Sequence, residues 1–177
     1  MNNMKRFLGI ATLIMILFVM TGQRAEAQNL KFGHVNSEEI MQALPATDSA
    51  TATLEAFRQE LINELELMQV ELNNKSEAYN KVSSTLTAIV KQNKEAELMD
   101  MQRRSQEFQN NAQQLLQAKQ MELFQPIYAK VDKAIKDVGK ENGFTYIFDI
   151  SKGSLLYFDE TKSTNLLALT KAKLGLK

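Results

Sequence analysis

The chain has 177 residues, one histidine and no cysteine, and its 21 basic residues are balanced by 21 acidic ones. The lack of cysteine excludes disulfides, thiolate catalysis and cysteine metal sites. Balanced charge gives no strong basic field of the kind that attracts nucleic acid, so we expect no nucleic-acid partner.

The first 27 residues have the pattern of a secretory signal peptide. Lys5 and Arg6 precede the apolar run "FLGIATLIMILFVM", and the small-residue sequence "AEA" ends at Ala27. The run is shorter than the roughly twenty residues that span a bilayer, so we expect cleavage after Ala27. An uncleaved anchor is the alternative. Cleavage leaves 150 residues with 18 bases and 20 acids.

The mature chain is predicted to begin with a strand and a short helix. The strand is "LKFGHV", residues 30–35, and Asn36 and Ser37 are good cap residues for a helix that ends before Pro45. A long helix follows, for which Thr47, Asp48 and Ser49 are alternative caps.

Apolar residues in this long helix recur with a seven-residue rhythm, which is typical of a coiled coil. Arg58 and Lys75 are the charged interruptions. The predicted seam consists of Leu54, Leu61, Leu65, Met68, Leu72, Tyr79, Val82, Leu86 and Ile89.

The stretch "SSTLT" interrupts the pattern, because serine and threonine hydroxyls compete for backbone hydrogen bonds. We expect an antiparallel helical hairpin over residues 47–139 with its tip near 83–91, and one continuous helix is the alternative. The second helix ends near Gly143. Its apolar stripe slips around Pro126, which is therefore a candidate hinge.

The last third of the chain is rich in aromatic and β-branched residues. "FTYIFDI", residues 144–150, and "SLLYFDE", residues 154–160, are predicted to form a strand hairpin, and residues 163–175 a final helix. With residues 28–46, residues 140–177 would make a discontinuous β-rich body and an α+β fold.

Three short strands give too little core to hold two long helices, so we expect the body to associate with further copies of the chain. The candidate residues of this oligomer body are Phe32, Val35, Phe144, Tyr146, Phe148, Leu156 and Phe158.

Several further apolar side chains lie outside the predicted seam, and such a stripe needs a second partner or a ligand. They would either contact a bound polypeptide or pack between the helices. These candidate contact residues are Phe57, Ile62, Leu67, Val70, Met99 and Met101.

Residues with catalytic potential do not gather in any recognisable pattern. His34 has no second histidine or cysteine with which to hold a metal, and Asp149, Asp159 and Glu160 are better explained by edge protection and capping. Glycine-rich phosphate loops and nucleophile elbows are absent from the sequence. We expect no enzyme activity, metal or cofactor.

The order of these elements resembles the Skp/OmpH family of periplasmic chaperones over nearly the whole mature chain. The segments that carry the resemblance are "FGHVNSEEIMQALP" and "NAQQLLQAKQMELFQPIYAKVDKAIKDVGKENGFTYIFD". The resemblance implies a homotrimer with a shared β-barrel body and helical arms that hold unfolded outer-membrane proteins without ATP. Its better-known members are strongly basic and have a proposed lipopolysaccharide site, whereas this mature chain has a slight acidic excess, so no residue is assigned to such a site.

Two functions are therefore expected to compete. The favoured one is a periplasmic holdase for unfolded outer-membrane proteins. The alternative is a coiled-coil adaptor or spacer that binds one folded partner. Weak attachment to the membrane surface through the tips of the helices is a third and lesser expectation. The basic pair at 103–104 would either contact membrane head groups or an anionic client, or be simply solvated.

Overall fold

The computed structural model describes residues 30–151, 153 and 155–176, and the predicted signal peptide lies outside them. Phe32–Lys177 form one unit, which is described here by itself. Its elements in chain order are β1 (Phe32–Val35), α2 (Ser37–Gln42), α3 (Pro45–Val82), η1 (Ser83–Thr85), α4 (Ala88–Glu141), β2 (Tyr146–Asp149), η2 (Glu160–Lys162), β3 (Ser163–Asn165) and α5 (Leu167–Lys173).

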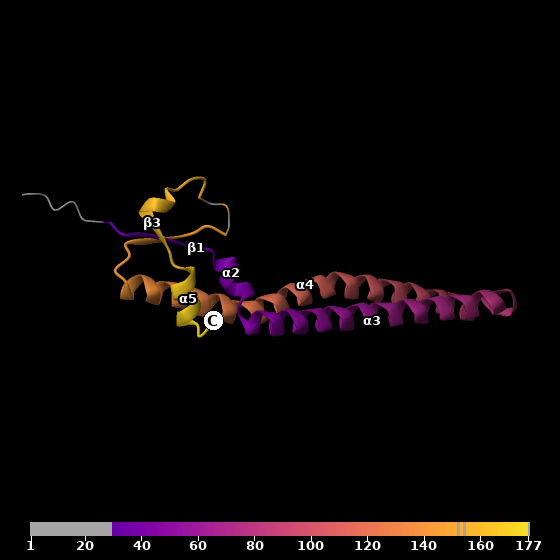
Figure 1. The fold of residues 1–177 in the computed structure, drawn as a ribbon. Helices are drawn as coiled ribbons and strands as arrows, with labels where there is room; N and C mark the ends of the chain where they lie inside the picture. The colour runs from indigo at the N-terminus through magenta and orange to yellow at the C-terminus, as the bar shows by residue number, and fades with distance from the viewer. Residues whose placement is uncertain (1–29, 152, 154, 177) are drawn as a thin grey trace, which may run out of the picture. The chain divides into compact units, whose positions relative to one another are not determined.

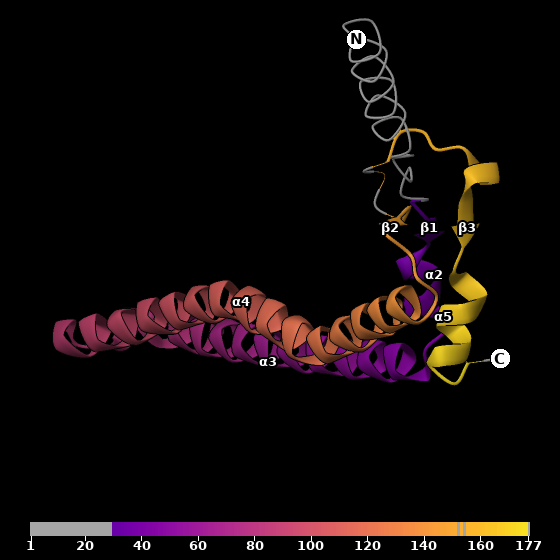
Figure 2. The same cartoon turned by 90° about the vertical axis from the view of Figure 1, so that its left-hand side faces the viewer.

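Two long helices, α3 with 38 residues and α4 with 54, lie side by side and antiparallel (Figures 1 and 2). The long-helix part of the predicted fold is therefore confirmed. We call α3 together with residues 88–123 of α4 the arm. The body consists of the three strands, α2, η2, α5 and residues 124–141 of α4.

The chain reverses direction between α3 and α4 without glycine or proline. The Ser83 hydroxyl donates to the Asn80 carbonyl at 3.2 Å, and the Thr85 hydroxyl donates to the Val82 carbonyl at 2.8 Å. Leu86 and Thr87 are then extended before α4 begins. Hydroxyl groups thus compete with the helical bonding pattern, and the alternative of one continuous helix is wrong.

The seam of α3 follows an eleven-residue repeat, not the predicted heptads. Leu54, Leu65 and Ser76 are all half-buried, and they lie eleven residues apart. Val82 and Ile89, predicted on the seam, are 45% and 66% exposed. From Leu54 onward, the half-buried positions in α3 are Leu54, Phe57, Leu61, Leu65, Met68, Leu72, Ser76 and Tyr79.

This repeat has a physical basis. Eleven residues over three turns give about 3.67 residues per turn, so an apolar side with this spacing keeps facing its neighbour when the helices wind slightly to the right and not to the left, as heptads would require. Arg58 and Lys75, which interrupt the heptads, lie outside the repeat and are exposed. The same spacing continues in α4 through Met101, Ala112 and Leu123.

Helix α4 connects the arm to the body. Figure 2 shows it changing direction toward its orange end, and Pro126 lies inside this helix, where it cannot donate a backbone hydrogen bond. Beyond the proline, Ile127, Val131 and Val138 are buried in the body. Pro126 as a moving hinge stays a prediction.

The sheet is parallel and has the order β2-β1-β3. The predicted strand hairpin is wrong, because β2 pairs with β1 and residues 155–159 form no strand. The third strand, Ser163–Asn165, uses residues predicted to start the last helix. Strand propensity identifies a strand but not its partner, and the long connection through α2, α3 and α4 permits parallel pairing.

The core of the body lies between the sheet and its helices. Val35, Ile40, Leu44 and Leu166 are each at most 2% exposed. A Cβ atom on Gly33 would lie 2.7 Å from Leu166 Cδ1, so a larger residue at this position would force the Leu166 side chain to move.

Candidate functional site

The arm exposes several large apolar side chains in addition to those of its seam. Among the candidate contact residues, Ile62, Leu67, Val70 and Met99 are exposed, with Leu67 at 64% and Met99 at 71%. The helix pair is already packed through its seam, so these four side chains are available to another molecule.

The expectation is corrected for two of the candidates. Met101 is only 5% exposed and Phe57 is half-buried, because the eleven-residue repeat places both on the seam. Met101 packs between the helices, and Phe57 lies on the same seam with part of its side chain exposed.

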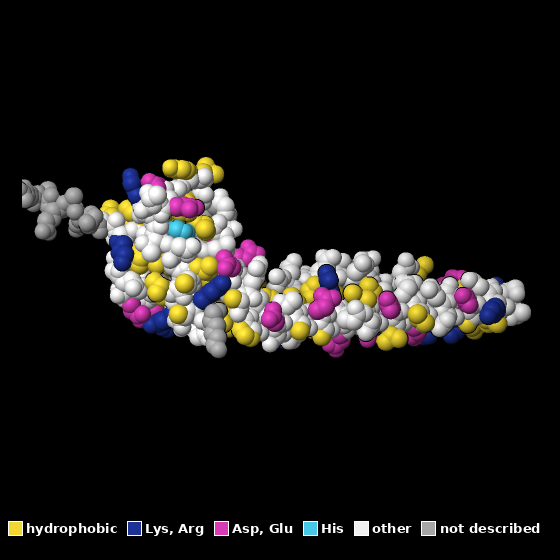
Figure 3. Space-filling view, viewed as in Figure 1, with side chains coloured by type: hydrophobic (Ala, Val, Ile, Leu, Met, Phe, Trp, Pro, Cys, Tyr) yellow, Lys and Arg dark blue, Asp and Glu magenta, His cyan; other side chains and the backbone are white. Residues whose placement is uncertain are grey.

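Leu115, Met121 and Tyr128 are also exposed apolar residues, although they were not predicted as contact residues. They lie in α4, in or close to its glutamine-rich part, and residues 108–118 contain no charged residue. Their apolar side chains stand at positions outside the spacing of the seam, and this feature of the sequence could have identified them. Figure 3 shows hydrophobic atoms scattered along the arm among uncharged and charged ones.

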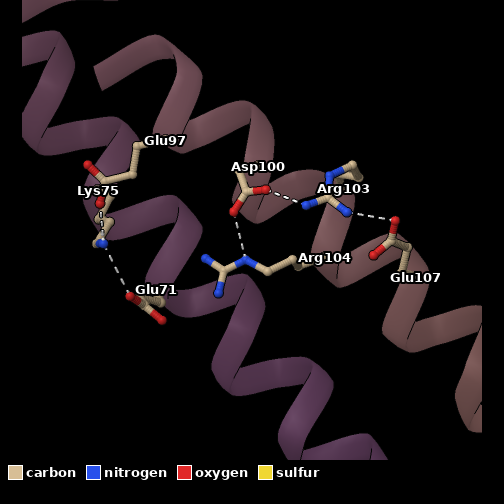
Figure 4. Close-up of polar contacts among 7 residues, drawn as sticks. All are labelled: Glu71, Lys75, Glu97, Asp100, Arg103, Arg104 and Glu107. Atoms are coloured by element: carbon tan, nitrogen blue, oxygen red, sulfur yellow. Dashed lines mark hydrogen bonds and ion pairs between the residues drawn. The ribbon is translucent and has the colours of Figure 1, made fainter. Parts of the chain in front are cut away.

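Two polar contacts join α3 to α4 near the tip of the arm. Lys75 Nζ lies 2.5 Å from Glu97 Oε1, and the Tyr79 hydroxyl donates to Glu95 Oε1 at 2.5 Å (Figure 4 shows the first). The hydrogen bond from Lys75 lowers the pKa of Glu97. The side chains of Lys75 and Glu97 are 43% and 39% exposed, so this ion pair contributes to the pairing of the two helices but adds little to their stability.

The basic pair at 103–104 is neutralised by acidic neighbours on its own helix. Arg103 contacts Asp100 and bonds to Glu107 at 2.8 Å, while Arg104 Nε lies 3.0 Å from Asp100 (Figure 4). The hydrogen bond from Arg103 holds the pKa of Asp100 below its usual value. This arrangement favours a solvated helix face over an anion-binding site.

The sheet presents an aromatic face on the side away from its core. The ring centroids of Phe32 and Tyr146 are 6.0 Å apart, and those of Phe32 and Phe148 are 6.3 Å apart. Tyr146 is 56% exposed, and β2 and β3 are the outer strands of the described sheet. An exposed aromatic face beside open strand edges is typical of a surface that another chain covers.

The other candidate body residues occupy different places. Val35 is buried in the core and Phe144 packs against it, so these two hold the body together. Phe158 lies against His34, with ring centroids 4.7 Å apart, and Leu156 is 98% exposed.

His34 and the acidic residues near the sheet have structural roles. His34 is 7% exposed, and its Nδ1 lies 2.9 Å from the Ser163 hydroxyl, which ties β3 to β1. Asp159 caps η2. Among the described residues, no group of three or more histidine or acidic side chains could hold a metal ion.

Asp149, at the end of β2, is hydrogen-bonded to the start of α2. Its carboxylate accepts hydrogen bonds from the Ser37 amide at 3.2 Å, the Ser37 hydroxyl at 2.5 Å and the Ser151 amide at 3.0 Å. Burial opposes ionisation, but the bonds from Ser37 and Ser151 together outweigh it and lower the pKa of Asp149. The carboxylate is therefore charged at neutral pH.

Within residues 30–151, 153 and 155–176, none of the helices has the length and apolar character needed to cross a membrane.

The fold thus defines a class of protein in which a small parallel sheet carries a long antiparallel helix pair. Residues 31–173 match the family of OmpH-like outer membrane proteins, and the chain belongs to this family. The resemblance found in the sequence is confirmed.

Individual relatives agree with this assignment. The chain is 27% identical over 172 residues to the chaperone protein Skp of Photorhabdus laumondii, covering 95% of this chain and 100% of the relative. It is 26% identical over 173 residues to Skp of Yersinia enterocolitica, covering 96% and 100%. The crystal structure of an OmpH-like protein from Caulobacter crescentus shares the fold, with a TM-score of 0.67, 14% identity and 82% of each chain covered.

Proposed function

We propose that the protein is an ATP-independent holdase of the periplasm that keeps unfolded outer-membrane proteins from aggregating. The observation that carries this proposal is the set of exposed apolar side chains that lie outside the seam through which the two helices pack. Leu67, Val70 and Met99 offer weak and adaptable contacts on an otherwise polar arm. Many such contacts hold a chain without requiring fuel for its release. The family's named chaperones support the same function.

The proposal includes a homotrimer whose bodies join through the aromatic sheet face. Three arms around one axis would enclose a space for a client. The support is the exposed stack of Phe32, Tyr146 and Phe148 beside open strand edges, together with the family resemblance. Export through a signal peptide at residues 1–27 would place the protein in the periplasm.

The test measures native mass by light scattering, with and without an unfolded outer-membrane β-barrel protein. We expect a trimer that forms a discrete complex with the client and suppresses its aggregation without nucleotide. A monomer at micromolar concentration would exclude the shared body. Tight binding of one folded protein, with no protection of unfolded clients, would favour the adaptor function instead.

Contact with an anionic membrane surface is a weaker proposal. Val82 and Ile89 are exposed near the tip, where Lys81 and Lys91 also lie. We expect weak sedimentation of the mature protein with vesicles containing anionic lipids, decreasing as salt is raised. Sedimentation equal to that with neutral vesicles would remove this contact from the proposed function.

A further inference from the structure

A groove of about 720 Å³ lies where the arm meets the body. It is bounded by α2, the start of α3, α4 and the ends of β1 and β2. Its volume falls in the range of about 300–1,000 Å³ that is usual for binding pockets. Met41, Phe124, Tyr128 and Ile135 supply apolar and aromatic walls.

Acidic side chains accompany these apolar walls. Glu38, Asp132 and Asp149 line the groove, and its lining residues include no lysine or arginine. Asp149 keeps its charge through the bonds from Ser37 and Ser151, and Asp132 also pairs with Lys136 at 2.6 Å in solvent. An apolar groove with an acidic lining is complementary to a cationic apolar ligand.

One polar atom of the groove has an unmet hydrogen-bonding requirement. Thr47 Oγ1 is buried, and it has no hydrogen-bond partner within the described part of the chain. Thr47 also lines the groove. A buried hydroxyl without a partner costs free energy, and rotation of the Thr47 side chain toward the groove would let an incoming donor or acceptor bond to it.

We propose that this groove binds an extended polypeptide segment in which a lysine or arginine is flanked by apolar residues. The apolar side chains would pack on Phe124 and Tyr128. The cation would lie beside Glu38 and would compete with Lys136 for Asp132. A backbone group would bond to the Thr47 hydroxyl once this side chain turns toward the groove. The inference rests on the proposed function, because it names the kind of client segment held at the base of the arm.

The experiment measures fluorescence anisotropy of labelled ten-residue peptides with the purified mature protein. One peptide combines leucine and phenylalanine with two lysines, and a second has glutamates in place of the lysines. We expect the lysine peptide to bind at least about tenfold more tightly, since opposite charges meet across a partly desolvated groove. Equal affinities, or no binding of the lysine peptide, would overturn the proposal.

Matched variants locate the binding. Glu38→Gln with Asp132→Asn is expected to weaken the lysine peptide about fivefold. The control, Glu60→Gln with Glu64→Gln on the exposed side of α3, removes the same charge and should change affinity less than twofold. If both pairs of substitutions weakened binding equally, the net charge of the protein would explain peptide binding. That result would contradict the proposed binding in the groove.

A charge reversal gives a second readout. Tyr128 is 57% exposed, so Tyr128→Lys should fold, weaken the lysine peptide and tighten the glutamate peptide. No change in the preference between the two peptides would count against the groove. Peptide binding that disappears as the protein oligomerises would show that a second copy covers the groove, which also contradicts the proposal.

Failure of this inference can be told apart from failure of the proposed function. A wild-type protein that protects unfolded clients while its peptide binding ignores the Glu38 and Asp132 substitutions would refute the groove alone. Conversely, groove-dependent peptide binding without any protection of clients would refute the holdase function.

Discussion

Replacing Leu166 with alanine is expected to lower the free energy of unfolding by about 3 kcal/mol, the usual cost of truncating a fully buried leucine. Leu166 is 0% exposed and fills the space above Gly33 in the body. Its backbone amide also donates to the His34 carbonyl at 2.9 Å, so the surroundings are held in place and cannot easily collapse into the cavity. Urea denaturation followed by circular dichroism, at one fixed protein concentration, measures the loss.

Leu169→Ala provides the matched control for this substitution. Leu169 lies in α5, the short helix whose N-cap is Leu166, but is 45% exposed. Its truncation should cost less than about 1 kcal/mol, because much of the side chain already contacts water. Similar losses for the two variants would mean that Leu166 does not anchor the core.

The double substitution Leu67→Ser with Val70→Ser is expected to weaken retention of an unfolded client by about tenfold, with little change in protein stability. Both side chains are more than half exposed, so serine removes apolar surface available to a client without opening a cavity. Affinity for an unfolded outer-membrane protein and urea denaturation of the free protein measure the two effects separately.

The corresponding control changes two residues of the seam, Leu61→Ser with Leu65→Ser. These side chains are partly buried between α3 and α4, so their loss should chiefly destabilise the arm. If Leu67 and Val70 behave like this pair, losing stability more than client retention, they belong to a packed interface and not to the client-binding surface.

Local chemistry allowed much of the arm to be predicted from sequence. The apolar spacing identified two long helices, and the hydroxyls around Ser83 and Thr85 identified the reversal between them. The exposed side chains Ile62, Leu67 and Val70 were also recognisable, because they lie away from the seam under either repeat.

The choice between a seven-residue and an eleven-residue repeat was not settled by the sequence. Both repeats combine steps of three and four residues, and they diverge only as the helix lengthens. The position of Phe57 and Met101 on the seam therefore depended on the course of two helices packed against each other. The position of a residue in the sequence shows which side of a helix it lies on only when the number of residues per turn is known.

By itself, the sequence determined the two long helices, the place where the chain reverses between them and the part of the chain that is rich in strand-forming residues. These properties depend on neighbours within a few positions, through hydrophobic spacing, proline geometry and hydroxyl competition for the backbone. Only the tertiary structure decided that β2 and β3 both pair parallel with β1, and that Glu38, Asp132 and Thr47 line one groove. Those arrangements join residues far apart in the chain, and contact energies between such residues are not encoded in local pattern.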